Sequence, residues 1–325
     1  MKLLVTGGLG FIGSNFIEYW FKKHGRDTII NLDKVTYAAD QRNLVGIGRY
    51  DYTFVKGDIS NPKTVLALSK NVDTIVNFAA ESHVDNSILN SSNFVKSNII
   101  GVHNLLEAVR RYGTRFHQVS TDEVYGSLPI NSKLKFNEKS RYNPRNPYSA
   151  TKAAADHLVN AYFNTYKLPV TISNCSNNYG PNQHPEKLIP KTIINAAKEM
   201  PIPIYGNGLQ VRDWIYVEDH CSAVEQIIKK GAYGETYLVS ANNERRNIDV
   251  IKSILKELNK SEKLINFVND RLGHDVRYAI DAGKITKELG WKPKITFGEG
   301  LKLTISHYLK NLDHYIKKVA IWPKN

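Results

Sequence analysis

The feature that most constrains the fold is a glycine-rich segment near the start of the chain, where residues 6–13 read TGGLGFIG. It follows a short apolar run, Lys2–Thr6, and opens an apolar-periodic stretch, Ile12–His24, so the expected context is strand, tight turn and helix. The glycines match G-x-G-x-x-G from Gly8 and G-x-x-G-x-x-G from Gly7. Backbone without side chains turns sharply and approaches a pyrophosphate, which then sits at the positive end of the helix. The segment predicts a dinucleotide-binding unit.

Short apolar runs alternate with helical patterns through the first half of the chain. Each run is apolar enough to be buried on both faces, as a parallel sheet requires. Alternation of this kind predicts an α/β fold with a doubly wound parallel sheet of the Rossmann type. The predicted strands are Lys2–Thr6, Thr28–Asp33, Tyr52–Lys56, Asp73–Phe78, Arg115–Ser120 and Val170–Asn174, and the predicted helices include Ile12–His24, Asn93–Arg111 and Tyr148–Tyr166.

The pattern changes after about residue 175, where polar segments containing proline and glycine interrupt shorter elements. We therefore expect residues 1–175 to form the dinucleotide-binding domain, with some later segments returning to it. Residues 176–325 should form mainly a smaller, mixed α/β lobe packed against that domain. The interrupting segments are Asn177–Lys187, Met200–Gly208 and Asp270–His274; a strand is expected at Asp213–Val217 and helices at Val217–Lys230 and Phe297–Leu312.

Length and composition indicate a globular enzyme. The chain has 325 residues, of which 42% are hydrophobic and 23% charged. No apolar run approaches the roughly 20 residues that span a bilayer, and the first residues are too briefly apolar for a signal peptide. The two cysteines, Cys175 and Cys221, have no spacing typical of a metal or redox site. We expect no membrane association and a reducing, cytoplasmic location.

The net charge of +13 raises the question of nucleic-acid binding, because lysine and arginine dominate affinity for phosphate backbones. Here the basic residues are scattered, often in pairs such as Lys22-Lys23 and Arg110-Arg111, and never form a block of five. A solvated surface with a few cations reserved for small phosphate ligands is therefore the better interpretation, and no nucleic-acid partner is expected.

An acidic residue, Asp33, stands at the end of the second predicted strand. At this position a carboxylate accepts hydrogen bonds from the adenosine ribose and repels a 2′-phosphate, which favours NAD over NADP, although Lys34 is adjacent. Asp58 follows the third predicted strand and is a candidate for the adenine amine. Ala79 and Ala80 follow the fourth, where small side chains let a cofactor lie close.

A tyrosine and a lysine at helical spacing, Tyr148 and Lys152, lie one turn apart on one face of a helix. The ammonium is expected to lower the pKa of the phenol, making it an acid–base group for alcohol–ketone redox chemistry. Asp122 and Glu123 follow the apolar run Phe116–Ser120 and suggest a second proton transfer. Two close carboxyls in a closed pocket do not both ionise cheaply, so one of them holds a proton. An incidental surface pair and a loop cap are the alternative interpretations.

With these motifs the chain resembles the extended short-chain dehydrogenase/reductases that act on nucleotide sugars, and within them the dTDP-glucose 4,6-dehydratase family. The resemblance runs from residue 3 to about residue 300, and the Thr121-Asp122-Glu123 element is its most diagnostic part. The matching segments are LDKVTYA at 32–38, AAESHVD at 79–85, STDEVYG at 120–126, SNNYGP at 176–181, PEKLIP at 185–190, QVRDW at 210–214 and DRLGHD at 270–275.

This resemblance implies conversion of dTDP-glucose to dTDP-4-keto-6-deoxyglucose and water, as in dTDP-rhamnose synthesis. Tyr148, supported by Lys152, accepts the proton of the 4-hydroxyl as a hydride passes to NAD, and Thr121 hydrogen-bonds the same oxygen. Glu123 then removes the proton at carbon 5, and protonated Asp122 gives its proton to the departing 6-hydroxyl. The hydride returns to carbon 6, so the cofactor ends as NAD.

The resemblance also implies which residues bind each ligand, with the nucleotide sugar falling to the second lobe. For NAD they are Gly7, Gly10, Phe11, Ile12, Gly13, Asp33, Lys34, Thr36, Asp58, Ile59, Phe78, Ala79, Ala80, Ser82, Ser97, Tyr148, Lys152 and Asn178. For the substrate they are Ser82, Thr121, Asn177, Lys187, Leu188, Pro203, Tyr205, Arg212, Asn247, Arg271 and His274, with the two arginines suited to the diphosphate because their planar fork matches phosphate oxygens.

Some positions depart from the family pattern. Leu272 stands where proline is usual, Asn86 where a basic residue is common, and His184 at an aromatic position. They lie outside the expected chemistry but bear on base and sugar selectivity. His83 and His274 are expected to line the pocket, because no spacing supports a metal site.

Two questions stay open at this stage. A sibling enzyme, such as a UDP-glucose 4,6-dehydratase, a 4-epimerase or a decarboxylase, shares the glycine motif and the Tyr148/Lys152 pair. A non-enzymatic dinucleotide-sensing or nucleic-acid-binding protein is the remaining alternative. The preference for thymidine over uridine is set by pocket shape and is not readable from the sequence.

Related enzymes pair two helices across a twofold axis, so Asn93–Arg111 and Tyr148–Tyr166 are expected to form a homodimer contact.

Overall fold

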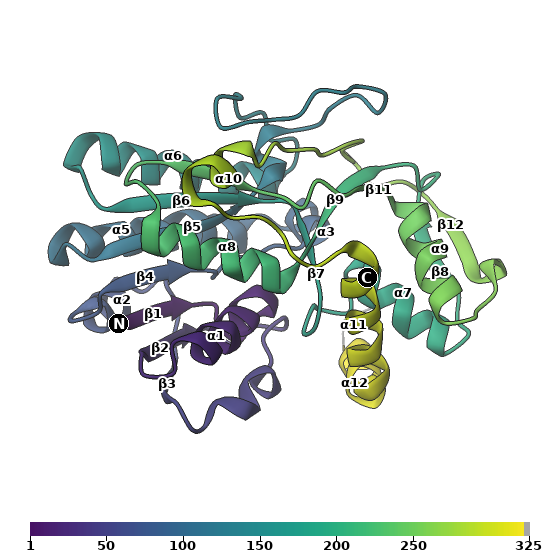
Figure 1. The fold of residues 1–325 in the computed structure, drawn as a ribbon, viewed down its shortest axis with the longest axis horizontal. Helices are drawn as coiled ribbons and strands as arrows, with labels where there is room; N and C mark the ends of the chain where they lie inside the picture. Colours follow the sequence, from purple (N-terminus) through teal and green to yellow (C-terminus); the bar gives the residue numbers. More distant parts are fainter. Residues whose placement is uncertain (322–325) are drawn as a thin grey trace.

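A seven-stranded parallel sheet forms the centre of the protein (Figure 1). The computed structural model describes residues 1–321, so residues 322–325 of the second predicted part lie outside the described residues. The strand order is β10-β6-β5-β4-β1-β2-β3, and every neighbouring pair runs parallel. The strands are β1 (Lys2–Thr6), β2 (Thr28–Asp33), β3 (Asp51–Lys56), β4 (Thr74–Asn77), β5 (Arg115–Thr121), β6 (Val170–Cys175) and β10 (Thr236–Val239).

Helices cover both faces of this sheet, which confirms the doubly wound α/β fold (Figure 1). On one face α1 (Phe11–Lys23) packs beside α8 (Val217–Lys230) over a core that includes Phe16 and Trp20. The other face carries α2 (Pro62–Ser69), α5 (Gly101–Tyr112) and α6 (Pro147–Tyr166) over a second core. The strand order reverses between β1 and β4, and a crevice is expected at the carboxyl ends of strands on either side of such a reversal.

The later part of the chain builds a smaller mixed region beside the sheet, at the right of Figure 1. It contains a three-stranded sheet, a two-stranded parallel sheet and a helical core in which Tyr179, Trp214 and Tyr308 are buried. Two later elements, β10 and α10, instead pack at the edge of the main sheet. The remaining elements are β7 (Asn177–Tyr179), β8 (Ile202–Tyr205), β9 (Val211–Tyr216), β11 (Glu244–Arg246), β12 (Ile265–Val268), α3 (Val84–Leu89), α4 (Ser92–Phe94), α7 (Leu188–Ala197), α9 (Asn247–Glu257), α10 (Gly283–Leu289), α11 (Phe297–Lys310), α12 (Leu312–Ile321), η1 (Gln41–Ile47), η2 (Val95–Ile100), η3 (Asp122–Tyr125) and η4 (Glu262–Leu264).

Two of the predicted elements need correction. Tyr52–Lys56 is a strand, but it lies at the edge of the sheet with exposed residues, because no strand covers its outer side. Asn93–Arg111 is not one regular helix: a π-helical stretch, η2, separates the short α4 from α5. The polar segments after residue 175 also hold two strands that the sequence did not indicate, β7 and β8.

The start of α6 is locked by its own sequence. The side chain of Asn146 accepts from the Ser149 amide at 2.9 Å, the Ser149 hydroxyl accepts from the Asn146 amide at 3.3 Å, and Pro147 occupies the first turn. This reciprocal cap fixes where the helix begins and therefore where Tyr148 lies. Within the described part of the chain, no helix combines the length and apolar character needed to cross a membrane.

Candidate active site

A narrow cleft runs along the carboxyl ends of β1, β2 and β4, where the sheet order reverses. Leu32, Ala38, Ala39, Gly57 and Glu81 line it without having been predicted. Most of the residues predicted to bind the cofactor also line it: Gly7, Gly10, Asp33, Lys34, Thr36, Asp58, Ile59, Phe78, Ala79, Ala80 and Ser97. Phe11, Ile12 and Gly13 form the first turn of α1, directly after this cleft's glycines.

The backbone of the glycine turn is packed so closely that a side chain at Gly7 or Gly13 would collide with it. Gly7 has φ of 72°, and a Cβ there would lie 2.6 Å from the amide nitrogen of Ala79. A Cβ on Gly13 would collide with the Gly7 carbonyl and lie 2.9 Å from the Gly8 Cα. The first turn of α1 carries no acidic side chain and no side-chain cap, so its amide groups and positive end are available to an anion. These residues fit a dinucleotide.

The acidic residues of the cleft are held by partners of their own. Both oxygens of the buried Asp33 carboxylate accept backbone amides, from Leu9 at 2.9 Å and Val35 at 2.8 Å. Burial raises the pKa of Asp33, whereas these two hydrogen bonds lower it. Asp58 forms an ion pair with Lys34 at 3.0 Å, so the lysine next to Asp33 is drawn toward a second carboxylate.

A larger cavity of about 600 Å³ opens beside the cleft, between the main sheet and the smaller region. Its volume lies in the range of about 300–1,000 Å³ typical of small-molecule sites. All the residues predicted to bind substrate line it except Thr121: Ser82, Asn177, Lys187, Leu188, Pro203, Tyr205, Arg212, Asn247, Arg271 and His274. Asn178, predicted for the cofactor, and the catalytic candidate Glu123 line this cavity as well.

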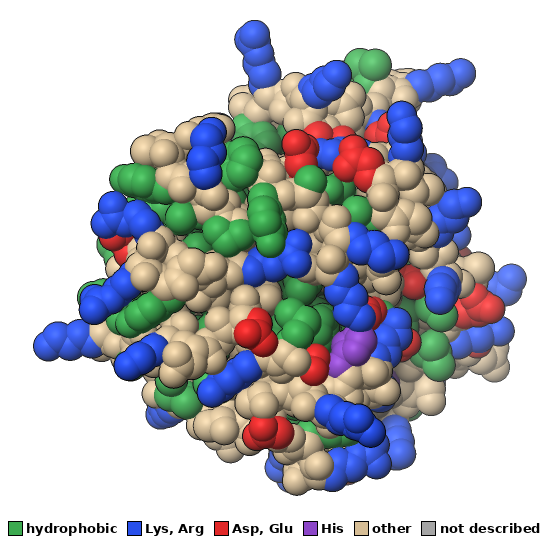
Figure 2. Space-filling view, turned by 60° about the vertical axis from the view of Figure 1, so that its left-hand side comes forward, with side chains coloured by type: hydrophobic (Ala, Val, Ile, Leu, Met, Phe, Trp, Pro, Cys, Tyr) green, Lys and Arg blue, Asp and Glu red, His purple; other side chains and the backbone are tan. Residues whose placement is uncertain are grey.

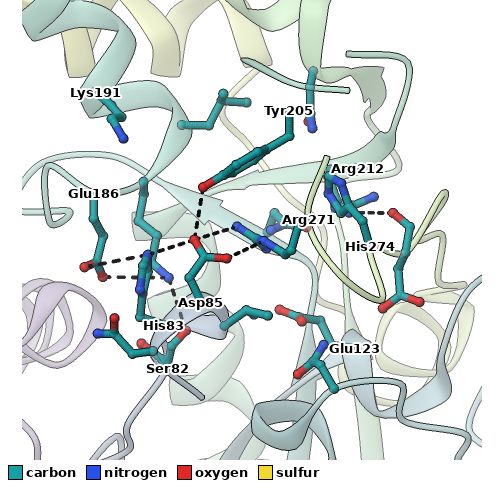
Figure 3. A pocket seen from close by; sticks show the side chains of 18 of the residues that line it. Ser82, His83, Asp85, Glu123, Glu186, Lys191, Tyr205, Arg212, Arg271 and His274 are labelled. Atoms are coloured by element: carbon teal, nitrogen blue, oxygen red, sulfur yellow. Dashed lines mark hydrogen bonds and ion pairs between the residues drawn. The ribbon is translucent and has the colours of Figure 1, made fainter. Parts of the chain in front are cut away.

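Asp85, an acidic residue that the sequence did not single out, lies in the middle of this cavity (Figure 3). Asp85 of α3 forms an ion pair with Arg271 at 2.6 Å and accepts a hydrogen bond from the Tyr205 hydroxyl at 3.2 Å. The Arg271 guanidinium in turn lies 5.0 Å from the centre of the Tyr205 ring. The cluster joins α3 to β8 and to the segment that follows β12. The only signal for Asp85 in the sequence was its place shortly after β4, in the segment AAESHVD.

The histidines of the cavity pair with carboxylates. His83 lies 3.7 Å from Asp85, and His274 contacts Asp270 at 2.6 Å. Burial on its own raises the pKa of Glu186, but the hydrogen bond with His184 and the charge of Lys187 lower it to about 2. Among the described residues, no three His, Cys, Asp or Glu side chains are grouped so that they could hold a metal ion.

The two adjacent carboxyls at the end of β5 have different surroundings. Asp122 is 2% exposed, and burial followed by the charges of Glu123 and Asp213 raises its pKa well above the usual range. Glu123 faces the cavity instead; burial raises its pKa, while the charges of Arg212 and Lys187 lower it. The pKa of both carboxyls is raised, but that of Asp122 is raised more strongly, so Asp122 holds a proton more tightly than Glu123 does.

Tyr148 and Lys152 are both buried on α6, but their electrostatics differ from the prediction. Burial and the charge of Glu123 raise the pKa of Tyr148 well above its usual range, while a hydrogen bond with Thr121 lowers it. The Lys152 ammonium donates to the Val119 carbonyl at 2.7 Å. The pKa of the phenol is therefore raised in this structure and not lowered as the Tyr148/Lys152 spacing predicts, because burial and a nearby carboxylate dominate.

Arg212 is held rigidly at the edge of the cavity. It is 8% exposed, its Nη1 and Nη2 donate to the carbonyls of Val211 and Asp275, each at 2.8 Å, and its guanidinium lies 4.2 Å from the centre of the Tyr278 ring. Because the side chain is already ordered, binding an anion there loses little rotamer entropy. Asp275 and Tyr278, which the sequence did not single out, hold Arg212 and also line the cavity themselves.

Known proteins with similar sequences are nucleotide-sugar dehydratases. The family model described as GDP-mannose 4,6 dehydratase matches residues 4–304. The dTDP-glucose 4,6-dehydratase of Mycobacterium tuberculosis is 47% identical over 96% of this chain and 94% of its own, and that of Xanthomonas campestris is 48% identical over 95% and 93%.

Solved structures agree with this assignment. The dTDP-glucose 4,6-dehydratase DesIV of Streptomyces venezuelae, crystallised with NAD bound, superposes with a TM-score of 0.95 at 40% identity, covering 98% of this chain and all of its own. A UDP-glucose 4-epimerase of Thermus thermophilus, also with NAD, has a TM-score of 0.87 but only 26% identity, covering 95% of this chain and 99% of its own. The chain therefore belongs to the GDP-mannose 4,6 dehydratase family and, within it, groups with the dTDP-glucose 4,6-dehydratases.

Proposed function

We propose that the protein is a dTDP-glucose 4,6-dehydratase, an NAD-dependent lyase that releases water and leaves dTDP-4-keto-6-deoxyglucose. The observation that carries the proposal is the pair of adjacent carboxyls in unlike surroundings, Asp122 buried and Glu123 facing a cavity of about 600 Å³. Redox alone needs the tyrosine and lysine, whereas elimination of water needs an acid and a base as well. The names of the relatives indicate that the nucleotide part of the substrate is dTDP, with thymine as its base.

The glycine turn and the cleft beside Asp33 would hold NAD, which would supply reversible hydride transfer when bound. Gly7, Gly10 and the first turn of α1 bind its diphosphate through backbone amides. Asp33 and the small Ala79 lie where the adenosine half would pass along the cleft.

The chain's own groups move the protons. Tyr148, hydrogen-bonded to Thr121, takes the proton of the sugar 4-hydroxyl, and Thr121 orients that oxygen. The resulting ketone acidifies carbon 5, whose proton goes to Glu123. Asp122, which keeps its proton because it is buried beside another carboxyl, delivers it to the departing 6-hydroxyl as water leaves.

The nucleotide part of the substrate is assigned to the smaller region. Arg212, already oriented by two carbonyls, and Arg271 bind the diphosphate as guanidinium forks. Tyr205 and Pro203 of β8 lie against the base. In this proposal residues 1–175, with the returning elements α8, β10 and α10, form the NAD-binding part, and the rest binds mainly the nucleotide sugar.

We further propose that the protein works as a homodimer in the cytoplasm. Val95 and Ile100 of η2 and Tyr166 of α6 are exposed although they are apolar, and they lie on the two helical segments expected to pair. On the face shown in Figure 2, lysines and arginines are spread singly, with hydrophobic side chains between them. Light scattering of the purified protein tests the dimer: a monomer mass at micromolar concentration would contradict it.

The decisive experiment incubates purified protein with dTDP-glucose and a catalytic amount of NAD. We expect a 4-keto-6-deoxy product that has lost one water by mass spectrometry, with no net accumulation of NADH. A product of unchanged mass and altered stereochemistry would identify an epimerase instead. Turnover of UDP-glucose at the same rate would remove the thymidine preference from the proposal.

A further inference from the structure

A third ionisable residue continues the line of Tyr148 and Lys152 along α6. Asp156 comes one helical turn after Lys152, so the three side chains share one face of the helix, with Cβ atoms of successive members about 5–6 Å apart. Its exposed fraction is 0%. Burying a carboxylate is unfavourable unless it is well paired, so this side chain needs an explanation beyond helix formation.

The partners of Asp156 come from the strand ends that carry the active site. Its Oδ2 accepts hydrogen bonds from the Ser120 hydroxyl at 2.7 Å, the Asn174 amide group at 3.0 Å and the Tyr142 hydroxyl at 3.1 Å. Asn174 also donates to the Thr121 carbonyl at 3.3 Å. One carboxylate oxygen therefore ties α6 to the ends of β5 and β6, directly before the Thr121–Glu123 segment.

The charge of Asp156 also acts through space on the ammonium of Lys152, one helical turn away, although the two groups form no ion pair within 4.0 Å. Burial lowers the pKa of Lys152, while the negative charge of Asp156 raises it. The effect is mutual, since burial raises the pKa of Asp156 and Lys152 lowers it. A lysine that is 4% exposed and bonded to the neutral Val119 carbonyl needs such a counter-ion to remain charged.

Other groups around this pair do not supply that charge. Cys175 of β6 faces Lys152, but burial raises the pKa of its thiol to about 12, so it is neutral at physiological pH. Tyr142 and Tyr125 face Asp156, and burial raises the pKa of both phenols above the usual range. Asp156 is thus the carboxyl whose negative charge favours the protonated form of Lys152.

We infer that Asp156 is a positioning residue for the reaction assigned under the proposed function, on which this inference rests. Its buried carboxylate is the counter-ion of Lys152 and holds α6 against the ends of β5 and β6, so that Tyr148 and the Thr121–Glu123 segment keep their relative places. It touches neither substrate nor cofactor and acts through Lys152, Ser120 and Asn174.

The first test needs no substrate and uses NMR of the full chain labelled with ¹³C at lysine Cε. The Lys152 signal is assigned by its loss in Lys152→Met. In the wild type Lys152 should be protonated at neutral pH although burial lowers its pKa; in Asp156→Asn its midpoint should fall by about one pH unit or more. A wild-type midpoint below about pH 7, or an unchanged midpoint in Asp156→Asn, would overturn the inference.

The matched control is Asp219→Asn. Asp219 is also buried, but it accepts the amides of Lys294 and Ile295 at 3.0 and 2.8 Å, away from the cavity. This variant should lose stability while leaving the Lys152 titration as in the wild type. An equal shift in both variants would reduce Asp156 to a structural residue and overturn its positioning role.

The second test measures kcat/KM for dTDP-glucose against pH. In Asp156→Asn the alkaline limb should move to lower pH by about one unit, because Lys152 loses its proton earlier, with NAD affinity changed less than about threefold. Asp156→Glu, which restores the charge, should recover the limb, and failure to do so with intact folding would count against the inference. If the wild type lacks dehydratase activity, the proposed function fails, and the lysine titration still decides the role of Asp156.

Discussion

The cofactor cleft and the substrate cavity lie side by side but are built in different ways. The cleft is made mainly of backbone and small side chains from consecutive βα units, and its critical contacts are steric, such as Gly7 against Ala79. The cavity is made of charged side chains from distant segments, such as Asp85 and Arg271, that pair with one another. A binding site made from backbone is specified locally, whereas a site made from charges depends on how far-apart segments meet.

The carboxyls of Asp122 and Glu123, at the end of β5, combine both kinds of site: they are neighbours in the sequence, but charges from distant segments act on them. Asp122 is buried beneath the cavity, and Glu123 opens into it, where the charges of Arg212 and Lys187 reach it. Two neighbours in sequence therefore differ in proton affinity because one faces inward and the other faces cations. The first prediction uses this difference.

Replacing Asp122 by asparagine should have the largest effect. The variant keeps its shape but loses the proton donor, so kcat should fall by about 10²–10⁴-fold while NAD affinity is unchanged. Product formation and NAD titration measure the two quantities separately. The exposed Asp313→Asn is the control, and wild-type kcat in Asp122→Asn would remove Asp122 as the acid.

The glycine turn should be the next most sensitive point, and its loss should appear in binding instead of kcat. In Gly13→Ala the new Cβ meets the Gly7 carbonyl, so we expect overpacking of about 1–3 kcal/mol, or about 5- to 150-fold weaker NAD binding. Isothermal titration with NAD measures this. Gly298→Ala, whose Cβ has nothing within 4 Å, is the matched control; equal affinities for both variants would contradict the steric account.

The contact between the two regions at His220 should make the protein less stable to unfolding at acid pH. His220 of α8 contacts Asn178 at 2.9 Å, and burial lowers the pKa of His220 to about 3. Because the folded pKa lies below the unfolded value, the unfolded state binds more protons below pH 6.5, and stability falls as pH drops from 6.5 toward 3. Between pH 7 and pH 5 this amounts to about 2 kcal/mol.

Urea unfolding at pH 7 and pH 5 measures that loss by comparison with His220→Gln, which should lose less stability over the same interval. The difference between the two proteins is the relevant quantity, because buried carboxyls with raised pKa, such as Asp122, act in the opposite direction. An identical pH dependence in both proteins would mean that His220 binds protons equally well in the folded and unfolded states. The account based on burial would then be wrong.

The smallest effect should come from the ion pair across the cavity. Asp85→Asn frees Arg271, and because both side chains are partly exposed the gain should be at most about 1 kcal/mol, or about fivefold tighter dTDP binding. Titration with dTDP at two salt concentrations measures it, with Asp270→Asn, which leaves Arg271 paired, as the control. Weaker binding would show that Asp85 itself contributes to the nucleotide site.

Local patterns were enough to predict the cofactor half of the molecule. The strands from Lys2–Thr6 to Val170–Asn174 are confirmed, and all except the exposed edge strand β3 are the buried, continuous apolar runs that a parallel sheet requires. The glycine turn and Asp33 meet at one crevice because consecutive βα units place their carboxyl ends on the same edge. In the smaller region β7, β8 and β12 were missed, because strands of three or four residues carry too little periodicity to be recognised.

The sequence by itself determined the sheet, the glycine turn and the chemical groups available at the end of β5. Only the tertiary structure decided which of those groups holds a proton, since that depends on burial and on charges from distant segments, Asp213 for Asp122 and Arg212 for Glu123. It also revealed Asp85 and Asp156, whose partners Arg271 and Ser120 lie far from them in the chain. Backbone conformation is encoded locally, but electrostatics acts through space, and space is set by the fold.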